Sequence, residues 1–238
     1  KIWMCWWQGL DSAPEIVKAC VESVRRNAGG REVIIITDKN VSNYVKFPSW
    51  IIKKIDAGII TRTNLSDLLR LSLLASYGGM WLDSTFYCVG SLDKSLYNGP
   101  IFSIKRPDYL HASVAGGMFA GYSLGCDDDH RRAFATIRDF FLEYWRRNDF
   151  MVDYLLVDYL TVLAQRHDPW IAEAFNEIQP NNPDCDELFK ILDQPYDEDM
   201  WKRLSAHTDL FKLTWKQDFP VEHDGEKTFY GMLEGIGD

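Results

Sequence analysis

Residues 64–85 constrain the fold of this chain more than any other stretch. Residues 65–77 contain no proline or glycine, and their leucines surround the helix axis, which predicts a largely buried helix. The two glycines at 78–79 predict its end. Residues 80–82 form a short apolar run that predicts a strand, and Asp83 follows it. Because ligands of α/β proteins bind beyond the carboxyl ends of strands, we expect Asp83 at a binding site.

Three polar side chains share one side of the predicted helix. Ser66, Asp67 and Arg70 fall within an arc of roughly 100°, at ~100° of rotation per residue. Charges on a buried helix are costly unless they have partners, so both charged side chains require an explanation. Two explanations stay open: Asp67 and Arg70 pair with each other along the helix, or both bind a ligand. Asp83 has the alternative role of a turn former.

The start of the chain predicts a βα unit that opens an α/β sheet. A buried strand is expected over residues 2–7 and a β-branched parallel strand over 33–37. Between them, Ser12 and Glu15 match a capping box that begins a helix. The rest of the chain predicts a short helix within 48–60, strands over 86–89, 101–104 and 118–122, helices over 127–147 and 151–166, and a late edge strand or lid over 211–216.

Composition bounds the class of protein. The 238 residues are expected to form a single domain. The formal charge of -9 argues against nucleic acid as a partner, because phosphate contacts require a basic face. Five widely spaced cysteines without a C-x-x-C pair predict reduced thiols in a cytosolic setting. No stretch approaches the roughly 18 to 20 apolar residues of a transmembrane segment.

Six short motifs spread over most of the chain carry a family resemblance. They are W-x-x-W-W-Q-G at 3–9, V-I-I-I-T-D at 33–38, S-D-L-L-R at 66–70, Y-G-G-M-W-L-D-S-T at 77–85, E-Y-W-R-R-N at 143–148 and K-L-T-W-K at 212–216. Together they resemble the capsular polysaccharide synthesis glycosyltransferases. These are related to the glycosyltransferases with a DXD-containing sugar-binding region (family 32) and, more remotely, to the large clostridial glucosylating toxins. The most specific motifs are S-D-L-L-R at 66–70, which contains Asp67, and Y-G-G-M-W-L-D-S-T at 77–85, which contains Asp83.

The resemblance implies a GT-A fold, an open and mostly parallel sheet flanked by helices. Its nucleotide-sugar-binding part is expected over 1–125 and a mostly helical acceptor-side part over 126–238. The family's base-stacking aromatic maps onto Trp6, with core packing of the tryptophan pair as the alternative. Arg70 is expected to donate to the sugar or diphosphate, and Asp67 to accept from sugar hydroxyls. The expected substrate-binding set is completed by Trp7, Gln8, Ser66, Trp81 and Ser84.

The metal motif departs from the family pattern. Asp83-Ser84-Thr85 stands where the wider family has Asp-x-Asp, so a neutral hydroxyl replaces one of two carboxylates. We expect a weak site for Mn²⁺ or Mg²⁺, held by Asp83, Thr85 and the donor diphosphate. Asp83 is also expected to be catalytic, because it is the only formal anion in the motif.

Asp153 is the second candidate catalytic residue. A family D-Y pair maps onto Asp153-Tyr154, which places Asp153 near the anomeric carbon or the acceptor hydroxyl. Asp158 lies five positions further along the same predicted helix and projects about 140° away, at ~100° per residue. The alternative is that both are solvated helix acids.

The resemblance implies a nucleotide-sugar donor and retention of anomeric configuration, and we expect a hexosyltransferase located in the cytoplasm. Its donor would be a UDP- or GDP-sugar and its acceptor a saccharide, and peripheral association with the inner face of the membrane stays open. Two alternatives remain. The reduced metal motif favours a non-catalytic carbohydrate-binding protein of the same fold, and hydrolysis of the nucleotide sugar requires no acceptor.

Overall fold

The helix and strand predicted over residues 64–85 both form. In the computed structural model, α3 spans Arg62–Tyr77 and β3 spans Gly79–Leu82. Thr61 caps the helix: its Oγ1 accepts a hydrogen bond from the Asn64 N–H, and the Asn64 side chain accepts one from the Thr61 N–H. Gly78 ends the helix with a φ of 62°, a value that favours glycine. Local sequence signals therefore fix both ends of α3.

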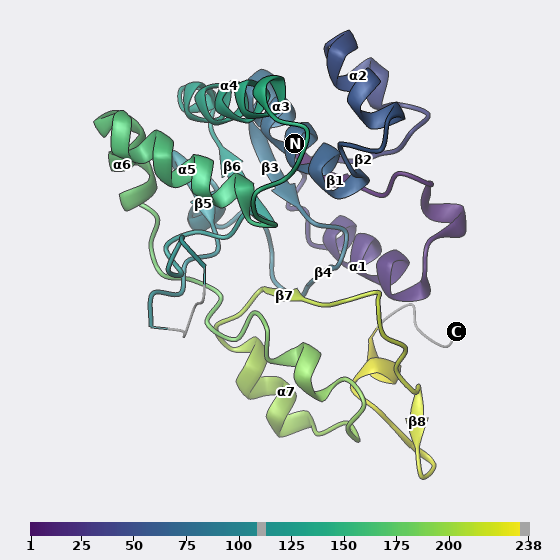
Figure 1. Cartoon of the computed structure of the whole chain (residues 1–238). Helices are drawn as coiled ribbons and strands as arrows, with labels where there is room; N and C mark the ends of the chain where they lie inside the picture. The colour runs from purple at the N-terminus through teal and green to yellow at the C-terminus, as the bar shows by residue number, and fades with distance from the viewer. Residues whose placement is uncertain (109–112, 234–238) are drawn as a thin grey trace. The chain divides into compact units, whose positions relative to one another are not determined.

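Five strands form a mostly parallel sheet in the order β2-β1-β3-β6-β5. β1 (Ile2–Cys5) pairs in parallel with β2 (Val33–Ile36), and β5 (Ile101–Ser103) pairs antiparallel with β6 (Ser123–Cys126). This confirms the predicted α/β class with an open, mostly parallel sheet and flanking helices (Figure 1). None of the helices in the described chain is long and apolar enough to cross a membrane.

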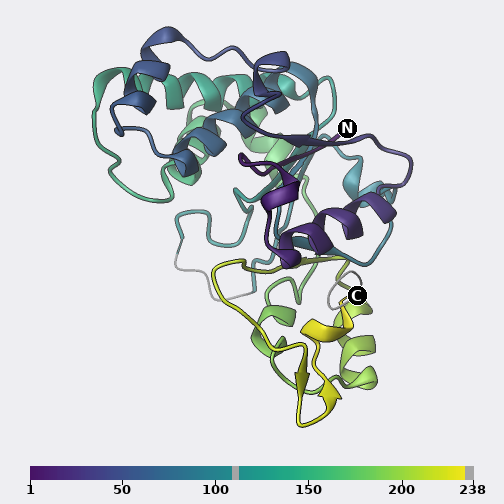
Figure 2. The same ribbon diagram turned by 90° about the vertical axis from the view of Figure 1, so that its right-hand side faces the viewer.

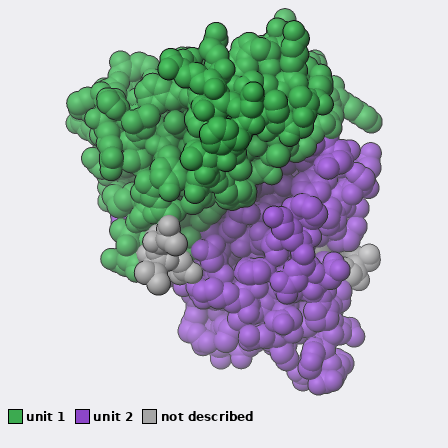
Figure 3. Space-filling view, in the orientation of Figure 1, with its two compact units in different colours: residues 1, 38–81, 95–179 green, residues 2–37, 82–94, 180–238 purple. Residues whose placement is uncertain are grey.

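The structure describes residues 1–108 and 113–233, and the chain divides into two compact units. Unit 1 holds Lys1 and residues 38–81 and 95–179, and unit 2 holds residues 2–37, 82–94 and those from 180 onward (Figure 3). The units alternate along the sequence and do not divide near residue 125. The single domain stays a prediction, and each unit is described by itself.

Unit 1 is built around a layer of helices. Its further helices are α2 (Ser49–Asp56), α4 (Arg131–Arg147), α5 (Leu156–His167) and α6 (Pro169–Asn176). α4 packs against both α3 and α5, and α5 packs against α6 (Figure 1). Lys54 Nζ donates to the backbone carbonyls of Trp145 and Asn148, at the end of α4. A cation there opposes the negative end of the helix dipole.

Unit 2 contains one long helix and several short elements. α1 spans Glu15–Arg26, and β4 (Phe86–Cys88) pairs antiparallel with β7 (Leu210–Lys212). The other elements are α7 (Glu198–Ser205) and the hairpin of β8 (Glu222–His223) and β9 (Glu226–Lys227), which Figure 2 shows at the yellow end of the ribbon. Short 3₁₀ helices occur in both units: Val41–Asn43 and Ser95–Tyr97 in unit 1, and Leu10–Ser12, Leu188–Ile191 and Tyr230–Met232 in unit 2.

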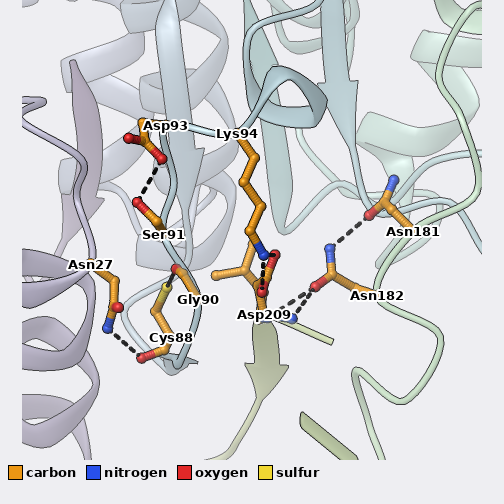
Figure 4. Close-up of polar contacts among 10 residues, drawn as sticks. Asn27, Cys88, Gly90, Ser91, Asp93, Lys94, Asn181, Asn182 and Asp209 are labelled. Atoms are coloured by element: carbon orange, nitrogen blue, oxygen red, sulfur yellow. Dashed lines mark hydrogen bonds and ion pairs between the residues drawn. The ribbon is translucent and has the colours of Figure 1, made fainter. Parts of the chain in front are cut away.

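A polar network fixes the start of β7 in unit 2 (Figure 4). Asn182 Oδ1 accepts hydrogen bonds from the backbone N–H groups of Asp209 and Leu210, at 2.8 and 3.0 Å. Lys94 Nζ lies 2.7 Å from each carboxylate oxygen of Asp209. These contacts bind three distant segments of the chain and so set the position of β7.

Three local predictions are wrong. Ser12 lies in the first 3₁₀ turn, and α1 begins after Pro14 without a side-chain cap. The strand predicted over 118–122 forms instead over Ser123–Cys126, because the chain turns between Ala120 and Ser123. Asp153 precedes α5 and is not part of it. Four of the five cysteines are buried and Cys5 is half-buried, and their reduced state stays a prediction.

Candidate functional site

A buried group of charges surrounds Arg70 in unit 1. Arg70 Nη2 lies 3.2 Å from Asp67 Oδ1, and both residues are only 7% exposed. Arg70 Nη1 donates to the backbone carbonyl of Gly121, and the guanidinium lies 5.3 Å from the centre of the Trp81 ring. Asp67 and Arg70 therefore pair with each other, as one of the two explanations predicted. Substrate binding by either residue stays a prediction.

Asp158 belongs to this buried group and was not selected from the sequence. It lies in the first turn of α5 and is 6% exposed. Burial raises the pKa of Asp158 to about 6, the positive charge of Arg70 opposes that shift, and the negative charge of Asp153 adds to it. The available signal was its place in an apolar run, because Leu156, Val157 and Leu160 are also buried.

Gly121 leaves the space that two charged side chains occupy. A Cβ at this position would lie 2.8 Å from Asp158 Oδ1 and 3.3 Å from Arg70 Nη1. The first distance is shorter than real Cβ contacts, so any larger residue would displace the carboxylate. We call Asp67, Arg70, Trp81, Gly121 and Asp158 the Arg70 cluster. Its charges are closely packed, and burial on this scale is costly without mutual compensation.

Asp153 lies in a different setting from Asp158. It is exposed, and its Oδ1 accepts a hydrogen bond of 2.7 Å from the backbone N–H of Leu155. The prediction that both acids share one helix, about 140° apart, is therefore wrong, because the helix begins at Leu156. A catalytic role for Asp153 stays a prediction.

A second cluster, in unit 2, joins two of the sequence motifs. Thr85 is buried, and its Oγ1 accepts a hydrogen bond of 2.6 Å from Lys212 Nζ. The same ammonium lies 3.9 Å from Asp83 Oδ2 and 5.8 Å from the centre of the Phe86 ring. We call Asp83, Thr85, Phe86 and Lys212 the Lys212 cluster. Lys212 was not selected as a site residue, although it begins the K-L-T-W-K motif.

The Lys212 cluster fits a divalent metal poorly. Mn²⁺ and Mg²⁺ require several oxygen ligands, preferably carboxylates. Asp83 is the only carboxylate of the cluster, and the Thr85 hydroxyl already accepts a hydrogen bond from the Lys212 ammonium. Across residues 1–108 and 113–233, no group of three or more His, Cys, Asp or Glu side chains could hold a metal ion. The metal stays a prediction, and no step is assigned to it.

The tryptophans after β1 differ in exposure. Trp6 is half-buried and packs edge-to-face on Trp215, with ring centres 5.5 Å apart. Its indole N–H is buried and has no hydrogen-bond partner in the described part of the chain. Trp7 is 8% exposed, whereas Gln8 is exposed. Trp6 is thus the more accessible of the pair, and it also packs against the buried core of unit 2.

The two serines of the expected substrate-binding set are partly exposed. Ser66 donates a hydrogen bond of 2.9 Å to the backbone carbonyl of Arg62, one turn earlier in α3. Ser84 lies in the turn between β3 and β4. Ser66 is thus partly engaged with its own helix, and binding by either serine stays a prediction.

Unit 2 also contains a cavity of about 530 Å³ with an aromatic lining. Its walls include Tyr87, Tyr196, Trp201 and Phe229, and the Arg26 side chain adds a positive charge. Flat aromatic rings with a few polar groups are typical of small-molecule sites. Nothing in the sequence pattern indicated this cavity, because its wall residues come from distant segments.

The fold and the two clusters define an α/β protein with a buried Asp67–Arg70 ion pair in unit 1 and a Lys212–Thr85 contact beside Asp83 in unit 2. Comparison with family models identifies the family: the capsular polysaccharide synthesis protein model matches residues 1–233, so the chain belongs to that family. Among solved structures, the chain is similar to one titled PaToxG Glycosyltransferase. The identity is 14% over 73% of this chain and 71% of that chain, with a TM-score of 0.47. Comparison with curated proteins gives no match. The family predicted from the motifs is thus confirmed.

Proposed function

We propose that the protein is a glycosyltransferase of capsular polysaccharide synthesis. It would move a hexose from a nucleotide-diphosphate sugar to a saccharide acceptor, with retention of anomeric configuration. The observation that carries the proposal is the Arg70 cluster in a chain of this family. A guanidinium held by a carboxylate, a carbonyl and an aromatic ring is costly to bury, and a guanidinium forms strong charge-assisted hydrogen bonds with phosphate groups and sugar hydroxyls.

In this proposal Arg70 is the binding residue, and Asp67 and Asp158 are positioning residues. Asp67 pairs with one nitrogen of the guanidinium, and burial raises the pKa of Asp158 while the nearby Arg70 charge opposes that rise. Both acids would hold the planar fork in one orientation, which favours bidentate contact with a phosphate or a diol. Asp153 is exposed and stays the candidate for the group near the anomeric carbon.

Trp6 is the candidate platform for the nucleobase. Its half-buried ring is held by the edge-to-face contact with Trp215, which limits its motion. A fixed indole offers a flat surface on which any base can stack. The ring alone does not select among nucleobases, and the proposed donors are UDP- and GDP-sugars.

The test is a donor screen. The protein is incubated with UDP- and GDP-hexoses, with and without saccharide acceptors, and both nucleotide release and the mass of the product are measured. We expect acceptor-dependent release for one donor, and its loss in Arg70→Lys, which keeps the charge but not the fork. Absence of release from every donor and acceptor pair would refute the proposal.

One observation favours a second candidate function. The Lys212 cluster fits a divalent metal poorly, which is the departure expected of a carbohydrate-binding protein that has lost transfer. Glycan-array binding without nucleotide release would support that candidate. Release of free hexose without any acceptor would instead support hydrolysis of the nucleotide sugar.

A further inference from the structure

We propose that Lys212 supplies the positive charge that the family motif assigns to a metal, so that the protein binds the diphosphate of its donor without a divalent ion. The inference rests on the proposed function, because it concerns the donor of that reaction. Its basis is the contact between Lys212 Nζ and Thr85 Oγ1 at 2.6 Å, beside Asp83 at 3.9 Å.

Strand pairing places the lysine at the motif. β4 and β7 pair antiparallel with Phe86 opposite Lys212, and the Leu213 N–H donates to the Thr85 carbonyl at 2.9 Å. The backbone on both sides of Lys212 is therefore fixed against the segment that follows Asp83. Since Thr85 is 4% exposed, its hydroxyl is a fixed acceptor for the ammonium. The fold therefore holds Lys212 next to the Asp83-Ser84-Thr85 segment.

The charges of the cluster balance in the same way as a metal motif. Two carboxylates with one divalent cation carry no net charge, and so do Asp83, neutral Thr85 and the Lys212 ammonium together. A carboxylate at position 85 would lie against the ammonium and neutralise it a second time. A neutral Thr85 beside the Lys212 ammonium thus leaves the positive charge of the lysine opposed by Asp83 alone.

The ammonium also has the chemistry and the access that a diphosphate requires. Lysine is a compact cation with three donors and binds phosphate as a point charge. The Lys212 side chain is 23% exposed and that of Asp83 is 30% exposed, so ligand atoms can reach the pair. The Phe86 ring lies 5.8 Å from the ammonium, which lowers the competition from water on that side.

The experiment measures binding of UDP and GDP by calorimetry, in EDTA and then in Mn²⁺ or Mg²⁺. Variants are Lys212→Gln and the matched control Lys216→Gln, because Lys216 is exposed and lies on the same segment. We expect the parent to bind in EDTA with an affinity that metal leaves nearly unchanged. Lys212→Gln should bind about ten- to a hundredfold more weakly, the effect of one charge-assisted hydrogen bond, and Lys216→Gln should match the parent.

Two further measurements make the result decisive. Binding of the uncharged nucleosides should be equal in Lys212→Gln and the parent, which shows that the variant folds and has lost only a phosphate contact. The double variant T85D/K212Q restores the Asp-x-Asp pattern and should bind the diphosphate more tightly with Mn²⁺ than in EDTA. Binding that requires metal in the parent, or that Lys212→Gln leaves intact in EDTA, would overturn the inference alone. Binding of no nucleotide under any condition would overturn the proposed function as well.

Discussion

Asp158→Asn should stabilise the protein at neutral pH. Burial raises the pKa of Asp158 from 3.8 to about 6, so the folded protein binds this proton more tightly than the unfolded chain does. A rise of roughly two units, at about 1.4 kcal/mol each, gives about 3 kcal/mol as the cost of ionising the carboxyl in the folded state. The asparagine has no proton to lose and avoids that cost.

The direction in which stability changes with pH follows from the same rise in the pKa of Asp158. Between pH 3.8 and about 6 the folded state holds more protons at this position than the unfolded state, so the stability of the parent falls as the pH rises. The stability that Asp158 contributes is fully present below the unfolded pKa and is lost above the folded one. The difference in free energy of unfolding between Asp158→Asn and the parent should therefore grow by up to about 3 kcal/mol over this window and stay constant above it.

Urea unfolding from pH 4 to pH 8 tests this expectation. The free energy of unfolding is measured for the parent, Asp158→Asn and the control Asp129→Asn, which removes an exposed carboxylate outside the Arg70 cluster and should change the stability little. A difference for Asp158→Asn that stays constant with pH, or that falls as the pH rises, would refute the reasoning. Comparison at each pH removes the titration that the parent and the variants share.

Three further variants probe the same structure. Arg70→Ala leaves a buried carboxylate unpaired and should lower the free energy of unfolding by ~3 to 5 kcal/mol, and addition of Asp67→Ala should recover much of the loss in urea unfolding. Trp6→Ala should weaken nucleotide binding in calorimetry by about 1 to 3 kcal/mol, and an unchanged affinity would assign the ring to the core. Gly121→Ala places a Cβ 2.8 Å from a buried carboxylate oxygen and should lower stability by about 1 to 3 kcal/mol, whereas Gly99→Ala, with its nearest atom at 3.8 Å, should be nearly neutral in thermal unfolding.

The parts of the fold that local signals encode could be predicted from the sequence. α3 and β3 follow from an unbroken apolar pattern and two glycines at the helix end. The strand expected over 118–122 failed because an apolar run alone does not fix strand pairing. Long-range pairing with β5 selects Ser123–Cys126 instead, a segment without β-branched residues.

The same distinction applies to the candidate site. Asp67 and Arg70 could be predicted as neighbours because they lie three positions apart on one helix. Lys212 could not be placed beside Thr85, because 127 positions separate them and only the pairing of β4 with β7 brings them together. The role of Asp158 could not be predicted without knowing where α5 begins, because burial in the folded chain raises its pKa.

The pairing of β4 with β7 also has a consequence for the newly made chain. Thr85 leaves the ribosome 127 residues ahead of Lys212, which is roughly 6 to 25 s at a synthesis rate of about 5–20 residues per second. During that interval β4 has no β7 to pair with, and Asp83 stands beside no lysine. In the nascent chain the edge of β4 is therefore unpaired with β7, and Asp83 has no ammonium from Lys212 nearby. Pairing of β7 with β4 changes both at once. The phosphate contact proposed for Lys212 can therefore form only after residue 212 has been synthesised and β7 has paired with β4.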